Sequence, residues 1–124
     1  MSARLVLLLA AFGLVPIALS YGVAPTKSVP YLLDFPVEGT NQSHVFRAIM
    51  GLYLANVLFW IAGALRQSLR RAALWSLFLF MAGLAAGRVL SLLLDGLPNF
   101  VLLFYLAAEL LFAALAFQAL RNTN

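Results

Sequence analysis

The sequence predicts an all-α membrane protein, a four-transmembrane-helix bundle with a long outer loop between its first two spans. Apolar residues make up 65% of the 124-residue chain and charged residues only 10%, with a mean hydropathy of +1.01. A soluble domain of this length normally has about 25% charged residues, so too little polar surface is present to coat a globule. Four apolar runs of about 17–23 residues fill most of the chain, and each is long enough to cross a bilayer core. We expect one transmembrane domain over residues 1–124.

The four spans are expected over residues 5–21, 44–65, 72–94 and 99–120. The first run follows a single Arg4 and has the features of a signal peptide, but we expect it to be retained as a span. Thr40 or Asn41 is a suitable N-cap for the second helix.

The connections between the spans differ in length and composition. Residues 66–71 form a short basic turn, and residues 95–98 form a tight turn of strong turn-formers. Residues 22–43 are expected to form one long outer loop. Within it, residues 29–37 are too apolar to extend into water. We expect this segment either to anchor at the membrane surface or to fold back as a lid over the bundle.

The charges at the span ends predict the orientation of the chain. Arginines fall on one side of the membrane, whereas the other side carries one lysine and three acidic residues. The first set is Arg4, Arg66, Arg70, Arg71 and Arg121, and the second is Lys27, Asp34, Glu38 and Asp95. The positive-inside rule therefore predicts that both termini are cytoplasmic. Because the basic residues cluster at helix ends, the net charge of +4 does not indicate a nucleic-acid partner.

The composition also excludes several kinds of chemistry. The chain has no cysteine and one histidine, which excludes disulfides, thiolate ligands and a multi-histidine metal site within one chain. No Ser–His–carboxylate set and no glycine-rich phosphate loop is recognisable. We therefore expect no catalytic residues, no metal and no cofactor.

Charged side chains inside the apolar runs point to a buried site. Glu109 lies ten residues into the last span, a depth of about 15 Å from its outer end. Arg88 lies seven residues before Asp95, about 10 Å deep from the same side, and Arg47 is the shallowest, at about 5 Å. A charge at a helix centre costs about 2.5–3.5 kcal/mol on insertion scales, so such residues pair or line a polar cavity. We expect Arg88 and Glu109 to make direct contact or to share one ligand.

Helical spacing places further polar residues on the same stripes as these charges. The predicted cluster is His44, Arg47, Arg88, Ser91, Asp95, Tyr105 and Glu109, whereas Tyr53 and Asn56 fall on a different side of their helix. Except for His44, which lies at the rim, we expect the cluster to line one outer-leaflet cavity beneath residues 29–37. Two interpretations stay open: a structural ion pair that fixes helix register, or a ligand site whose surplus of arginine favours an anionic or amphipathic molecule.

The third span carries a pair of glycines at the spacing used for close helix packing. Gly83 and Gly87 form a small-xxx-small pattern, which lets another helix approach at backbone distance. Because the pattern is short, we expect it to serve packing within the chain rather than dimerisation.

Several strings along the chain resemble a known family. They are Phe46-Arg-Ala-Ile-Met-Gly-Leu-Tyr-Leu54, Phe80-Met-Ala-Gly-Leu-Ala-Ala-Gly-Arg88, Leu90-Ser-Leu-Leu-Leu-Asp-Gly-Leu-Pro98 and the later Glu109. Together they resemble a domain-of-unknown-function family of small bacterial four-helix inner-membrane proteins, similar in layout to DoxX-type proteins. The resemblance implies four spans in a bacterial cytoplasmic membrane and supplies no mechanism. The matching residues are Arg47, Gly51, Tyr53, Arg88, Ser91, Asp95, Gly96 and Glu109.

These observations lead to competing hypotheses about function. The first is a protein that binds a membrane lipid or a small amphipathic ligand in an outer-leaflet polar pocket. The second is an accessory or stabilising subunit that packs against a larger membrane-protein partner. A small proton-coupled transporter ranks third, because pairing with arginine holds Glu109 ionised, and an enzyme ranks fourth.

Overall fold

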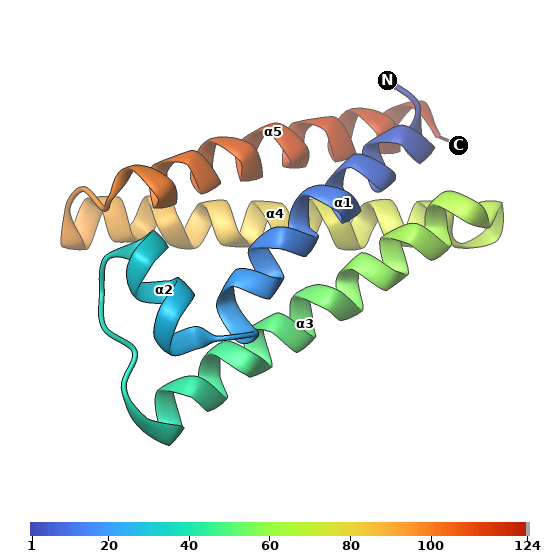
Figure 1. The fold of residues 1–124 in the computed structure, drawn as a ribbon. Helices are drawn as coiled ribbons and strands as arrows, with labels where there is room; N and C mark the ends of the chain where they lie inside the picture. Colours follow the sequence, from blue (N-terminus) through green and yellow to red (C-terminus); the bar gives the residue numbers. More distant parts are fainter. Residues whose placement is uncertain (124) are drawn as a thin grey trace.

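The computed structural model describes residues 1–123, which form five helices joined by short connections (Figure 1). These are α1 (Ala3–Gly22), α2 (Pro25–Leu33), α3 (Gly39–Leu65), α4 (Gln67–Asp95) and α5 (Phe100–Asn122). Four of them, α1, α3, α4 and α5, are long and apolar enough to cross a membrane. The chain is thus an all-helical, multi-pass membrane protein, as its composition predicts.

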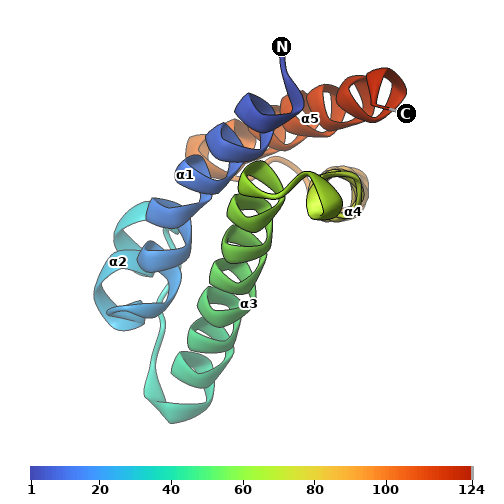
Figure 2. The same ribbon diagram turned by 90° about the vertical axis from the view of Figure 1, so that its right-hand side faces the viewer.

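The helices form two antiparallel pairs, α1 with α3 and α4 with α5, and α1 also contacts α4 and α5 (Figures 1 and 2). α1 packs most extensively on α3, and α4 pairs with α5 along its length. α3 and α4 meet at their connecting turn and diverge toward the opposite end of the bundle. Both chain ends and the α3–α4 turn therefore lie at one end, while α2 and the α4–α5 turn lie at the other. All five helix-end arginines belong to the first end.

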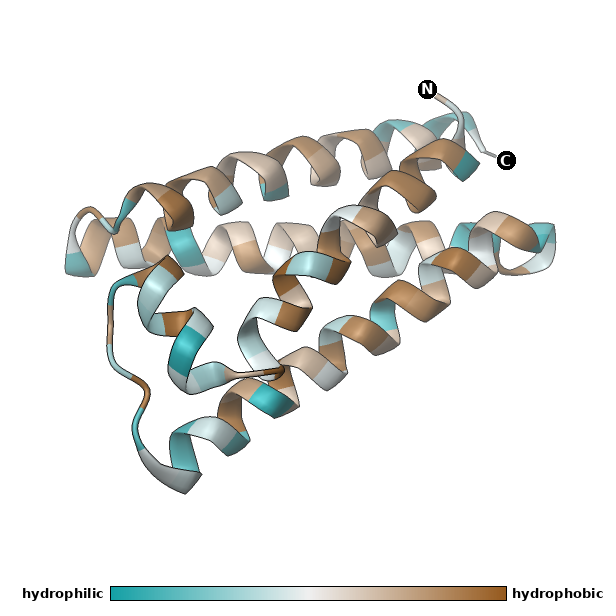
Figure 3. Ribbon diagram, viewed as in Figure 1, coloured by the Kyte–Doolittle hydropathy of each residue, from teal (hydrophilic) through white to brown (hydrophobic). Residues whose placement is uncertain are grey.

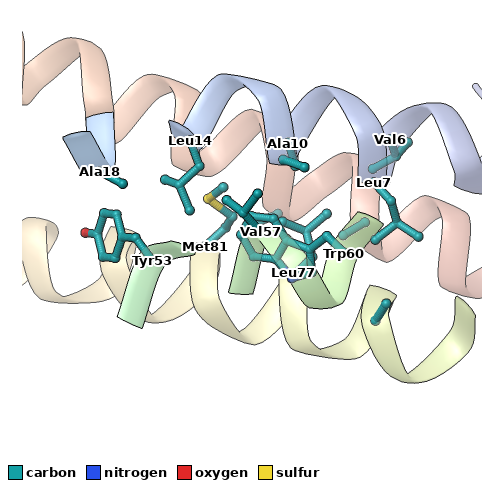
Figure 4. Packing of buried hydrophobic residues seen from close by; sticks show 14 of the residues in the cluster. Val6, Leu7, Ala10, Leu14, Ala18, Tyr53, Val57, Trp60, Leu77 and Met81 are labelled. Carbon is teal, nitrogen blue, oxygen red and sulfur yellow. The ribbon is translucent and has the colours of Figure 1, made fainter. Parts of the chain in front are cut away.

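The core is built around α1, whose small residues let its neighbours approach closely. Ala10, Ala11 and Ala18 are buried on α1, and larger side chains from α3 and α4 fill the space beside them (Figure 4). Trp60 is completely buried, and its indole N–H donates to the Ser76 hydroxyl at 2.9 Å. The outer surface of the spans, by contrast, exposes many large apolar residues, and hydrophilic residues gather toward the two ends (Figure 3). This is the pattern of a bundle surrounded by lipid.

The long outer loop expected over residues 22–43 is not present as such, because it contains helix α2. Pro25 occupies the first turn of α2, where a missing N–H costs nothing and the fixed φ favours a helix. Val29 and Leu33, one turn apart, are buried against the bundle. Asp34 ends the helix in the left-handed conformation, with φ of 62°. Pro25 therefore marks the start of a helix and Pro30 lies inside it, so these prolines did not indicate a loop.

Two helices begin earlier than the apolar runs predict. α3 starts at Gly39 rather than near His44, and α4 starts at Gln67 rather than Ala72. Hydropathy detects only the part of a helix that lies in lipid, whereas backbone hydrogen bonding continues into the polar turns at each end. The N-cap of α3 is Glu38, not Thr40 or Asn41, and its backbone N–H donates to the Gln42 side chain at 2.6 Å.

The expected close packing at Gly83 and Gly87 is not found within the chain. A Cβ placed at either glycine would meet nothing within 4 Å, and both residues are exposed. Close approach occurs instead at Gly63, where a Cβ would lie 2.3 Å from the Cβ of Ala73. α3 and α4 touch at this point, next to their turn, and then diverge, so the two glycines further along α4 have no helix opposite them.

Candidate functional site

An ion pair between α4 and α5 forms the centre of the site. Arg88 Nε donates to Glu109 Oε1 at 2.8 Å and to Oε2 at 3.1 Å. The Glu109 side chain retains 8% of its accessible surface and that of Arg88 retains 22%. The direct contact expected from their depths is therefore present, and the buried carboxylate has a charged partner.

Aromatic side chains surround this pair. The Arg88 guanidinium lies over the Tyr105 ring, with 5.7 Å from Cζ to the ring centroid, in a cation–π arrangement. Tyr21 from α1 lies within electrostatic reach of the same guanidinium. Tyr21 contacts Tyr53 of α3 edge-on at 5.7 Å, and Tyr53 contacts Phe80 at 5.1 Å. Residues from all four long helices thus meet around one arginine.

The terminal nitrogens of Arg88 are not used by the ion pair. Both bonds to Glu109 come from Nε. The Tyr21 hydroxyl lies close to the same guanidinium, but the bond geometry joins neither terminal nitrogen to an acceptor among residues 1–123. No buried side-chain nitrogen or oxygen in this part of the chain lacks a partner, so these nitrogens must have accessible surface. One edge of the guanidinium is thus held by Glu109 and one face is covered by Tyr105. The remaining edge carries four N–H donors, and the Tyr21 hydroxyl lies close enough to share one of them.

Two cavities meet at Arg88. The larger, of about 620 Å³, is a groove between the diverging α3 and α4 that reaches the α4–α5 turn. The smaller, of about 290 Å³, lies between α1, α4 and α5. Both are lined by Tyr53, Leu84 and Arg88. Gly83 and Gly87 form part of the larger groove, and their exposure shows that it opens at the bundle surface.

The other predicted residues of α4 lie toward the outer end of the groove. Ser91 lines the groove, and its hydroxyl donates to Asp95 Oδ2 at 2.7 Å. Asp95 itself is exposed and lines neither cavity. Arg88, Ser91, Tyr105 and Glu109 are therefore brought together at the cavities, with Asp95 in contact through Ser91.

Arg47 and His44 lie elsewhere, contrary to the expected common cavity. Arg47 donates from Nη1 to the carbonyl oxygens of Gly22 and Val23, at 2.8 and 3.4 Å, and so caps the end of α1. His44 is exposed on the first turns of α3. Neither lines one of the two cavities at Arg88. The last carbonyls of a helix have no partner within the helix and attract cations, which explains the position of Arg47.

The segment over residues 29–37 does not cover the site either. No residue of this segment lines either cavity. α2 is instead held against α5 by Asn99, whose side-chain amide donates to the Leu32 carbonyl at 2.9 Å while its oxygen caps α5. Tyr31 points outward, with 88% of its surface exposed. α2 therefore packs at the outer end of the bundle.

Tyr53 is the main site residue that helical spacing did not predict for the cluster. We expected the Arg47 face of α3 to turn inward, whereas Tyr53 faces the core with Val57, Trp60 and Ala64. These residues are spaced at i, i+4, i+7 and i+11, the repeat of one helix face. The large aromatic residues on that face were the available signal for the buried side.

Comparison with protein families identifies the family but not its chemistry. The family model described as a domain of unknown function (DUF4345) matches residues 2–120, so the chain belongs to this family. The resemblance noted from the strings around Arg47, Arg88 and Glu109 is thereby confirmed. Searches among curated proteins and among solved structures find no significant match.

Proposed function

We propose that this protein binds a small amphipathic or lipid-like molecule, with the polar end of the ligand at Arg88 and its apolar part in the α3–α4 groove. The observation that carries the proposal is the free edge of the guanidinium at the meeting point of two cavities. A group of N–H donors at membrane depth is costly without acceptors. A bound acceptor would satisfy them.

The shape and lining of the groove support the same proposal. Its volume of about 620 Å³ lies within the range of about 300–1,000 Å³ usual for small-molecule sites. Apart from Tyr53, Arg88 and Ser91, its lining consists of apolar residues and glycines. An apolar wall with a few convergent polar groups is the usual form of a ligand pocket.

The test is to fill the groove without touching Arg88. Gly83 lines the groove five residues before Arg88, and a Cβ placed there meets nothing within 4 Å. We expect a lipid-like molecule to remain bound to the wild-type protein in native mass spectrometry after purification in mild detergent. Gly83→Leu should lose it while keeping the helical circular dichroism spectrum and the melting temperature.

A matched control is available on α3. Gly51 also has open space around its Cβ position, but it lines neither cavity. Gly51→Leu adds the same side chain to the bundle surface and should leave the bound molecule in place. Equal amounts of bound lipid in the wild type and both variants would show that the groove is not a specific site.

A second candidate is an accessory subunit that packs against a larger membrane protein. The observation that favours it is the unoccupied Gly83–Gly87 face, which leaves space for a helix at backbone distance. In that case a large subunit should co-purify with the wild type and be lost from Gly83→Leu. The mass of the species that Gly83→Leu loses separates a bound lipid from a protein partner.

The orientation in the membrane belongs to the same proposal. We infer that the end carrying Arg4, Arg66 and both termini faces the cytoplasm of a bacterial cell, with the protein in its inner membrane. The placement of all helix-end arginines at one end of the bundle supports this by the positive-inside rule. Arg88 and the larger groove then lie in the outer leaflet, and the smaller cavity extends from Arg88 past the middle of α1 and α5.

A further inference from the structure

We infer that the polar group of the ligand is an uncharged carbonyl, as in a lipid ester or ketone, rather than a carboxylate, sulfonate or phosphate. This inference rests on the proposed function and narrows the chemical class of the ligand. It differs from the expectation drawn from the sequence, in which a surplus of arginine favoured an anion. Three features of the site support it.

The first feature is the net charge of the cavity lining. Arg88 and Glu109 are the only charged side chains among the described residues that line either cavity, and they neutralise each other. Arg47, which supplied the predicted surplus, is bound to carbonyls at the end of α1. An anionic ligand would therefore bring one uncompensated charge to a depth of about 10 Å, where charge is strongly disfavoured.

The second feature is the kind of hydrogen-bonding group that is free. The terminal nitrogens of Arg88 are donors only. The carboxylate oxygens of Glu109, the strongest acceptors nearby, are already bonded to Nε. A carbonyl oxygen only accepts, so it satisfies these donors and leaves no hydrogen-bonding group of its own unpaired.

The third feature is the apolar path from Arg88 to the bundle surface. The groove continues past Arg88 between Leu52, Leu92 and Leu102. Gly83 and Gly87 of α4 also line it and have no side chains to fill it. An alkyl chain attached to the carbonyl would lie along these residues and reach the bilayer through the open side of the groove. Such a chain would also keep the ligand at the depth of Arg88.

The experiment compares two probes that share an alkyl chain and differ in charge. Methyl palmitate carries a neutral ester carbonyl, and hexadecanesulfonate stays ionised at any accessible pH. Equilibrium binding of each radiolabelled probe is measured on the full-length protein in mild detergent. We expect the wild type to bind the ester at least about tenfold more tightly than the sulfonate. An uncompensated charge at this depth costs more free energy than a tenfold change in affinity represents.

Glu109→Gln provides the charge-changed variant, and Arg88→Gln/Glu109→Gln is its neutral control. In Glu109→Gln the guanidinium is uncompensated, so the preference should move toward the sulfonate by at least about tenfold. The neutral double variant should bind both probes more weakly but still prefer the ester. Retention of the wild-type preference in Glu109→Gln would overturn the charge argument.

The wild-type comparison decides the inference even where a variant fails to fold. A wild type that prefers the sulfonate overturns it, and so does a wild type that binds neither probe. In both cases the proposed function still stands, provided that Gly83→Leu loses a native bound molecule. Failure of that separate test overturns the proposed function itself.

Discussion

Arginine plays two different parts in this protein, and the difference depends on what lies opposite each side chain. Arg88 meets a carboxylate within the apolar part of the bundle, whereas Arg47, Arg70 and Arg71 donate to carbonyls at helix ends. Arg70 bonds the Gly63 and Ala64 carbonyls at the end of α3, and Arg71 bonds those of Leu120 and Thr123 at the end of α5. These caps satisfy backbone groups that would otherwise lack partners. Of these four arginines, Arg88 alone lines the two cavities.

The first prediction concerns the free energy of unfolding when the Arg88–Glu109 pair is broken. Arg88→Gln or Glu109→Gln alone should destabilise the protein by about 3 kcal/mol, because each leaves an unpaired charge at membrane depth. The double variant should be more stable than either single variant, since no buried charge remains. Reversible unfolding in mixed detergent micelles measures all four proteins of the cycle. Additive losses would mean that the two charges are not energetically coupled.

At the scale of elements, one close contact and one divergence create the site. α3 and α4 are joined by a single residue, Arg66, between their ends. They touch at Gly63 and Ala73, and they separate further along, where α1 and α2 occupy the space beside α3. The groove is the part of this separation that no other helix fills. Its existence therefore depends on how closely α3 and α4 approach near the turn.

The second prediction tests that close approach. Gly63→Ala should lower stability by about 1–3 kcal/mol, because the new methyl would overlap the Cβ of Ala73. Exchanging the two residues, as Gly63→Ala with Ala73→Gly, should restore most of the loss. Gly87→Ala is the matched control on α4, since a Cβ there meets nothing within 4 Å. Thermal unfolding in detergent measures the series, and a double variant no more stable than Gly63→Ala would refute the contact.

At the scale of the whole molecule, charge separates the two ends of the bundle. One end holds both termini and the arginine-rich α3–α4 turn, and the other holds α2 and the α4–α5 turn. The acidic residues other than Glu109 belong to the second end. This asymmetry gives the chain a defined orientation in a membrane.

The third prediction tests that orientation by thiol labelling. The chain contains no cysteine, so a single introduced cysteine is the only thiol of the protein that the reagent can label. Ser2→Cys and Ser68→Cys should resist a membrane-impermeant maleimide in intact cells, whereas Glu38→Cys should react, because these exposed positions lie at opposite ends. All three should react after the cells are permeabilised. Labelling at residue 68 with protection at residue 38 would reverse the topology.

The sequence alone determined which segments span the membrane and which charges lie deep within them. Apolar length and positive charge are local properties, so four spans, their common arginine-rich end and the pairing of Arg88 with Glu109 could all be predicted. The family was also recognisable from short strings. Helix ends were predicted less accurately, because hydropathy does not detect the polar first and last turns of a helix. The start of α3 at Gly39 is an example.

Only the tertiary structure decided which face of each helix is buried and where space remains. Arg47 and Tyr53 lie on different faces of α3, and in an apolar helix surrounded by lipid both faces are compatible with the sequence pattern. Packing against α1 turned Tyr53 inward and brought Arg47 to the end of α1. In the same way, the spacing of Gly83 and Gly87 predicted a close helix neighbour, but the divergence of α3 from α4 left a groove. Spacing fixes which residues share a face, and the crossing of the helices fixes what that face meets.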